Sequence, residues 1–104
     1  MQNRRQTDRQ RITVQGRYRS GYNQYKNVTI LGLSEAGCSL FDTSAKIRQG
    51  ETLTLRIDTL GPFEATVIWI NAAQFGVQFA KPLYGPVFDH ICKNLDTPEW
   101  RPAQ

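Results

Sequence analysis

The sequence predicts a mainly β protein, either a barrel or a sandwich, with one helix near the C-terminal end. Short runs of alternating apolar and polar residues recur at intervals of roughly 8 to 12 residues, and Gly or Pro lies between them. One later run has apolar residues at helical spacing instead. The 104 residues suffice for one domain with one core, because a chain of this size buries roughly two-thirds of its unfolded surface.

The first half of the chain contains three predicted strands. Arg11 to Arg19 alternates strictly between apolar and polar residues, which is typical of a half-buried strand. Gly21 to Asn23 supplies turn residues before a second β-rich run at about residues 25–33, so a hairpin is predicted. Ser34 to Gly37 breaks the pattern, and Cys38 to Phe41 resumes it as a short strand.

Three more strands are predicted in the second half. The run at residues 52–57 alternates after Gly50, and Gly61-Pro62 is expected to end it. Residues 63–70 (FEATVIWI) are β-branched and aromatic on both faces, which favours a more central strand. Residues 75–79 form the last predicted strand.

One segment reads as a helix. Phe88, Ile91, Cys92 and Leu95 form an apolar stripe, and Gly85-Pro86 suits a helix start. We expect this helix to cap the β structure.

Positive charge is concentrated at the start of the chain. Residues 1–26 contain seven basic groups and one acid, whereas the remainder contains six basic groups and eight acids. The whole net charge of +4 therefore comes from the front quarter. A one-sided charge of this kind indicates an anionic partner.

The segment NRRQTDRQR contributes Arg4, Arg5, Arg9 and Arg11 and contains no lysine. The planar fork of an arginine matches phosphate oxygens and the O6/N7 edge of guanine, and it stacks on flat π surfaces. This composition favours recognition of a nucleotide or a phosphate. The alternative is a solvated basic arm without a specific ligand.

The sequence gives no sign of catalysis or of a metal site. His90 has no nucleophile that can be paired with it, and Cys38 and Cys92 lack zinc-site spacing and are expected to be reduced core residues. We expect no enzyme, no cofactor and no metal. Long apolar segments are also absent, so we expect no membrane insertion and a cytoplasmic location.

The stretch GLSEAGCSL is a second candidate for ligand binding. Ser34 and Gly37 bracket a tight turn, where a hydroxyl beside free backbone N–H groups can hold a phosphate. An ordinary β-turn is the alternative.

Taken together, these two stretches resemble the PilZ domain, a family of receptors for cyclic di-GMP. The family's RxxxR element matches Arg5 to Arg9, preceded here by Arg4. Its [D/N]xSxxG element matches Gly32 to Gly37. The run from Val67 to Leu83 is similar to the family's closing hairpin, and the resemblance covers about residues 4–95.

The resemblance implies a six-stranded antiparallel β-barrel with a C-terminal helix over one end. It divides the chain into an arginine-rich arm at 1–10, a barrel domain with its helix at 11–95, and a tail at 96–104. The ligand would lie on the outside of the barrel, and a protein partner would respond to it.

The resemblance also implies roles for single residues. Arg5 and Arg9 would hold the guanine edges and phosphates of cyclic di-GMP, with Arg4 assisting. Ser34 and Gly37 would meet the ligand through a hydroxyl and the backbone. For Trp69, two alternatives stay open. It lies either against a guanine or inside the core.

Gly32 departs from the family pattern, which has Asp or Asn there. Losing one hydrogen bond of this kind costs about 1 to 3 kcal/mol, or about tenfold to a hundredfold in affinity. A second hypothesis is therefore a PilZ-like domain that binds no nucleotide and acts by protein contact. A third is a basic barrel that binds RNA or single-stranded DNA, although the acidic remainder of the chain argues against it.

Overall fold

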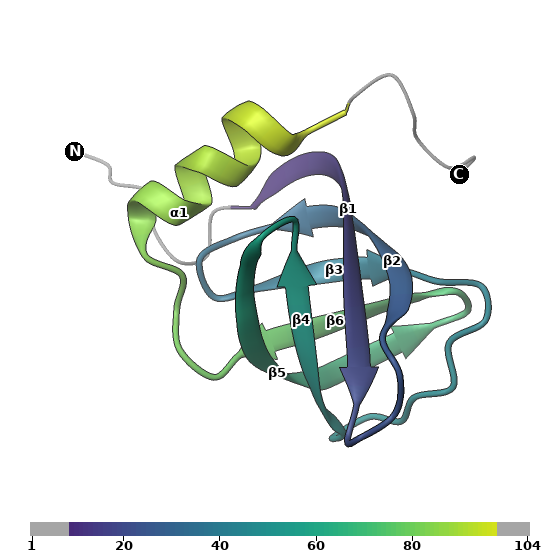
Figure 1. Ribbon diagram of the computed structural model, residues 1–104. Coiled ribbons are helices and arrows are strands. Elements are labelled where there is room, and N and C mark those ends of the chain that lie inside the picture. The colour runs from purple at the N-terminus through teal and green to yellow at the C-terminus, as the bar shows by residue number, and fades with distance from the viewer. Residues whose placement is uncertain (1–8, 98–104) are drawn as a thin grey trace.

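The computed structural model describes residues 9–97, and six strands followed by a helical segment account for most of them (Figure 1). The strands are β1 (Gln10–Ser20), β2 (Lys26–Leu33), β3 (Gly37–Phe41), β4 (Thr52–Ile57), β5 (Leu60–Asn71) and β6 (Gln74–Phe79). Helix α1 (Gly85–His90) continues directly into a π-helical segment, η1 (Ile91–Leu95).

The strands close into a barrel in the order β1-β2-β3-β6-β5-β4, and every neighbouring pair is antiparallel. Pairing between β1 and β4 completes the ring. The structure therefore decides between a barrel and a sandwich in favour of the barrel, and it confirms the six-stranded antiparallel architecture that the resemblance implied. Full closure leaves no open sheet edge.

The core fills the interior of this barrel with one face of each strand. In β4, for example, Leu53, Leu55 and Ile57 are buried, whereas Thr52 is exposed. The predicted alternation is thus confirmed for this strand. Burying an aliphatic side chain of this size stabilises the fold by about 1.5 to 3 kcal/mol, so the barrel is held together from the inside and its outer wall is free for function.

Two expectations about the second half are wrong. The run at residues 63–70 is not buried on both faces, because a closed barrel has one interior: on the outer wall, Ile68 and Trp69 are 45% and 38% exposed. Ile70, which pairs with the buried Phe75, is also 43% exposed near the end of β5. Gly61-Pro62 does not end β4 either. The chain turns earlier, at Asp58, whose φ of 56° a short polar side chain tolerates, and Gly61-Pro62 belongs to β5.

The helical segment covers one end of the barrel, as predicted (Figure 1). Pro86 lies in its first turn, where the missing N–H costs nothing. Phe88 and Ile91 are buried in the core, and Cys92 and Leu95 pack against it. Among residues 9–97, no helix is long and apolar enough to span a membrane.

The residues just after the helix are tied to β1. Thr13 donates its backbone N–H to Asp96 Oδ1 (2.7 Å), and its carbonyl accepts bonds from the backbone N–H and the hydroxyl of Thr97, each 2.8 Å long. The pairing of β1 with β2 is irregular between Arg11 and Val14, so these bonds satisfy backbone groups at that irregularity. The first two residues of the predicted tail therefore belong to the folded domain.

Candidate ligand-binding site

Five residues form one row across the outer wall of the barrel, which we call the outer row. Arg11 pairs with Gly32, Gly32 with Ser39, Ser39 with Gly76, and Gly76 with Trp69. Residues directly opposite each other on neighbouring strands share a face, so the row runs over β1, β2, β3, β6 and β5. Its middle consists of small residues, which leaves a low floor between a guanidinium group and an indole.

Two planar side chains lie on the glycines of this row. A Cβ atom on Gly32 would be 3.3 Å from both Cδ and Nη1 of Arg9, and a Cβ atom on Gly76 would overlap the indole of Trp69. At both positions the missing side chain lets a flat group rest on the sheet. Arg9 is the last residue before β1, so the predicted arm reaches the barrel wall at this point.

Of the three arginines predicted to hold the ligand (Arg4, Arg5 and Arg9), Arg9 is the one that the structure describes. Its side chain is exposed, and its positive charge acts on the buried thiol of Cys38 beneath the wall. Burial raises the pKa of that thiol to about 12, and Arg9 partly opposes the rise. Cys38 is therefore a free, protonated core residue at neutral pH. Arg4 and Arg5 lie outside the described residues, and their predicted contacts stay predictions.

The turn from Ser34 to Gly37 is closed by its own hydrogen bonds. Ser34 is buried, and its Oγ accepts the backbone N–H groups of Ala36 and Gly37, each at 3.2 Å. The hydroxyl lies 3.3 Å from the carbonyl of Gly37, which also accepts the backbone N–H of Ser34 (2.9 Å). In the structure these two residues shape the turn, and a direct contact between either of them and a ligand stays a prediction.

Gly37 is needed for close packing. A Cβ atom there would overlap the carbonyl oxygen of Val77 on β6. The turn also receives two bonds from the chain leading to the helix, because Phe79 N–H bonds to the carbonyl of Ala36 and Leu83 N–H to that of Glu35, both at 2.8 Å. The turn is thus fixed rigidly beside the start of β1, where Gln10 pairs with Leu33.

Trp69 lies outside the core, so the core alternative for its position is wrong, and its contact with a guanine stays a prediction. The pairing of β5 with β6 shifts between Val67 and Trp69, so Ile68 is an extra residue. A bulge of this kind turns neighbouring side chains to the same side. Ile68 and Trp69 are accordingly both exposed, and the indole lies across Gly76.

Ser39 and Gly76 are members of the outer row that the sequence did not single out. Ser39 Oγ lies 2.9 Å from the place where a Cβ atom of residue 32 would be. A hydroxyl therefore occupies the space next to Arg9 into which the family's Asp or Asn would project. The sequence contains no local signal for this, because the register between β2 and β3 brings the residues together.

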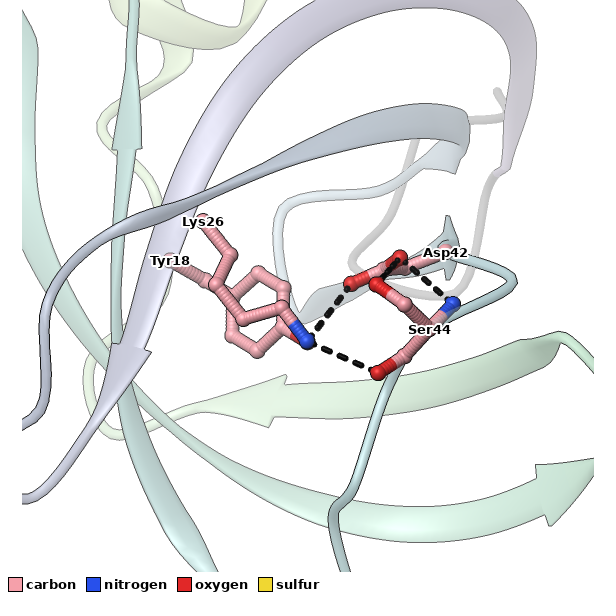
Figure 2. Close-up of polar contacts among 4 residues, drawn as sticks. All are labelled: Tyr18, Lys26, Asp42 and Ser44. Atoms are coloured by element: carbon pink, nitrogen blue, oxygen red, sulfur yellow. Dashed lines mark hydrogen bonds and ion pairs between the residues drawn. The ribbon is translucent and has the colours of Figure 1, made fainter.

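A second polar cluster lies apart from the outer row and serves the fold (Figure 2). Tyr18 donates to Asp42 Oδ2 (2.8 Å), Lys26 Nζ lies 3.7 Å from the same oxygen, and Ser44 donates to Oδ1 through its N–H and its hydroxyl (both 2.9 Å). Burial alone would raise the pKa of Asp42, but these hydrogen bonds and the lysine charge outweigh it and hold that pKa below the ordinary value. The cluster fixes the loop after β3.

His90 lies at the end of α1, and its Nδ1 is 3.1 Å from the side-chain amide of Asn94. Within residues 9–97, no group of three His, Cys, Asp or Glu side chains could hold a metal ion.

The domain is a small closed barrel with a filled interior, and its outer wall carries the candidate groups. The family model of the PilZ domain matches residues 3–89, and the chain belongs to this family. Members of the family generally are receptors for cyclic di-GMP. No curated protein matches the sequence.

Proposed function

We propose that this protein is a receptor for cyclic di-GMP that binds the nucleotide on the outer row and thereby regulates a protein partner. The observation that carries the proposal is the position of Arg9. In this PilZ domain, Arg9, the second arginine of the RxxxR element, lies over Gly32, and the outer row that contains Gly32 ends at an exposed tryptophan, Trp69. A guanidinium and an indole on a floor of small residues offer flat surfaces on which a guanine can stack.

The residues on and beside the outer row have separate chemical tasks in this proposal. Arg9 supplies a fork of donors for a guanine edge or a phosphate, and Arg4 and Arg5 add to it from the preceding segment. Trp69 supplies an aromatic face. Ser34 and Gly37 act by holding the turn beside the arm.

Ser39 takes over part of the role of the missing acidic residue. Its hydroxyl can accept a hydrogen bond from Arg9 or from the ligand in the space that Gly32 leaves open. A neutral hydroxyl forms weaker bonds with a guanidinium than a carboxylate does. The affinity for cyclic di-GMP is therefore expected to be lower than that of a domain with Asp at this position.

The signal to the partner follows from the connections of β1. The arm leads directly into β1, and Thr13 in the same strand is bonded to Asp96 and Thr97 behind the helix. Ordering of the arm around a ligand would act on this strand and change the surface near the helix. The regulated process would be motility, adhesion or exopolysaccharide production, as in the family.

One observation favours a second candidate function. Arg9 and Trp69 lie directly on the two glycines of the row, so the protein's own side chains cover part of the floor. Combined with Gly32, this arrangement suits a PilZ domain that has lost its nucleotide and acts by protein contact alone. Such a domain would capture the same partner with and without cyclic di-GMP.

Titration calorimetry with cyclic di-GMP, GTP and a short RNA tests the proposal. We expect heat with cyclic di-GMP alone, and a loss of about tenfold or more in affinity for Arg5→Ala and Arg9→Ala. Arg48→Ala is the matched control, because Arg48 lies in the loop before β4, away from the row. Absence of heat at high micromolar cyclic di-GMP would leave the protein-contact function in its place.

A further inference from the structure

Three arginines gather on a different wall of the barrel, where β1 meets β4. Arg17 pairs directly with Arg56, and Arg19 lies two residues further along β1, opposite Thr54. Residues two apart on a strand share a face, so all three guanidinium groups belong to the outside of this strand pair. We call them the arginine face. Figure 1 shows β1 between β4 and β2 on this side of the barrel.

Tyr25 supports two of these arginines. The Cζ atom of Arg17 lies 5.4 Å from the centre of its ring, and that of Arg19 lies 5.0 Å away. Stacking of a guanidinium on an aromatic ring restrains the long side chain and keeps its charge at the surface. The arrangement is therefore held in place before any partner arrives.

The charges of the arginine face are not neutralised. Within residues 9–97, no carboxylate lies within ion-pair distance of Arg17, Arg19 or Arg56, whereas Lys26 on the neighbouring strand is 3.7 Å from Asp42 (Figure 2). Like charges directly opposite each other destabilise a strand pair. The buried Nε of Arg19 also has no hydrogen-bond partner in this part of the chain. The fold thus maintains an unfavourable arrangement of charge, which is typical of a surface kept for a partner.

The borders of the arginine face indicate what kind of anion fits it. Thr54, which lies opposite Arg19, pairs in turn with Glu64 on β5. The carboxylate of Glu64 therefore lies in the same row as Arg19, two strands away. Asp58 is exposed two residues after Arg56. These acids would repel the evenly spaced phosphates of a nucleic acid that extended beyond the face. A short peptide with a few carboxylates avoids them, and each carboxylate can accept two parallel bonds from an arginine fork.

We propose that the arginine face, supported by Tyr25, is a docking surface for an acidic segment of a protein partner. Arginine and tyrosine are among the residue types enriched where binding energy concentrates at protein interfaces. The surface lies on β1 and β4, whereas the floor of the outer row lies on β2, β3 and β6. The arginine face is therefore separate from the floor on which we propose that the nucleotide binds.

Fluorescence anisotropy with a labelled short peptide that carries three glutamates tests this proposal, with the same peptide carrying three glutamines and a single-stranded DNA of ten nucleotides as comparisons. We expect the double variant Arg17→Ala/Arg56→Ala to bind the glutamate peptide at least about tenfold more weakly than the natural protein. The double variant Lys81→Ala/Lys93→Ala removes the same charge from exposed positions elsewhere and should bind as the natural protein does. Thermal unfolding checks that each variant is folded.

A third variant, Arg17→Lys/Arg56→Lys, keeps the charge and removes the fork, so its affinity should lie between the other two. The proposal is overturned if both alanine double variants weaken binding equally, if glutamine and glutamate peptides bind alike, or if the DNA binds more tightly than the glutamate peptide and loses that binding in Arg17→Ala/Arg56→Ala.

Discussion

The outer row and the arginine face place arginines on the same barrel in two different ways. Arg9 lies over Gly32 with small residues beside it, so its side chain has room to rearrange around a ligand. Arg17 is stacked on Tyr25 and opposes Arg56, so its guanidinium is fixed in advance. The first environment suits a small ligand that reorders the chain, and the second suits a rigid surface on which a partner docks.

The largest expected effect on stability comes from substituting Gly37. Comparing it with Gly76 is informative, because an added Cβ would meet backbone at one glycine and a side chain at the other. Gly37→Ala should destabilise the protein by about 3 kcal/mol, since the added Cβ overlaps the backbone carbonyl of Val77, which cannot move without distorting β6. Gly76→Ala should cost only about 1 kcal/mol, because the added Cβ meets the side chain of Trp69, which can swing outward. Urea unfolding measures both values.

Tryptophan fluorescence of the folded Gly76→Ala variant provides the second readout, since the indole should become more exposed. Equal destabilisation by the two substitutions would contradict the distinction between a rigid turn and an adaptable floor.

Tyr18 lies inside the barrel, between Arg17 and Arg19 of the arginine face on β1, and a substitution there tests the stability of this wall. Tyr18→Phe should lower the free energy of unfolding by about 2 kcal/mol at neutral pH, because it removes the hydrogen bond to the Asp42 carboxylate. Burial, followed by the hydrogen bond to Asp42, raises the pKa of Tyr18 above its ordinary value of 10.0. The folded state then keeps a proton that the unfolded state loses.

The stability that Tyr18 contributes is consequently complete below pH 10.0 and declines as the pH rises above that value. Urea unfolding at about pH 7 and about pH 10.5 should show the difference between the natural protein and Tyr18→Phe shrinking. Tyr84→Phe is the matched control, because it removes the same hydroxyl from a side chain that is 73% exposed. A difference that stays constant with pH would contradict the assignment.

A substitution at Gly32 is expected to raise the affinity for cyclic di-GMP rather than lower it. Gly32→Asp should strengthen cyclic di-GMP binding by about tenfold, because a carboxylate would be placed next to Arg9. The new Cβ would lie 2.9 Å from Ser39 Oγ, and that hydroxyl can rotate away. Gly32→Ala makes the same steric demand without the acceptor, so it should not improve the affinity. Calorimetry that ranks Asp no better than Ala would contradict this role.

Much of the fold could be predicted because it depends on local pattern. The alternation in β4 and the stripe containing Phe88 and Ile91 record directly which side chains enter the core. The exposure of β5 could not be predicted in the same way. A strand with apolar residues on both faces has the same sequence pattern whether both its faces are covered or only the face inside a barrel is. The bulge that brings Ile68 and Trp69 to one side also depends on pairing with β6.

The candidate site was predictable only in part, for the same reason. Arg9, Ser34 and Gly37 belong to short motifs that can be read along the chain. By contrast, the contact of Trp69 with Gly76 and the pairing of Arg17 with Arg56 are set by the register between strands. Register is a property of the closed barrel, and single runs of sequence do not contain it.

Substitution of Ser39 has the smallest expected effect on cyclic di-GMP affinity. It tests whether a residue that only strand register places beside Gly32 contributes to binding. If its hydroxyl replaces part of the missing acidic side chain, Ser39→Ala should weaken cyclic di-GMP binding by about threefold to tenfold, which is the contribution of one neutral hydrogen bond. In the background of Gly32→Asp the same substitution should have little effect, because the carboxylate then serves Arg9. Equal losses in both backgrounds would show that Ser39 acts independently of position 32 and that the two residues do not share one role.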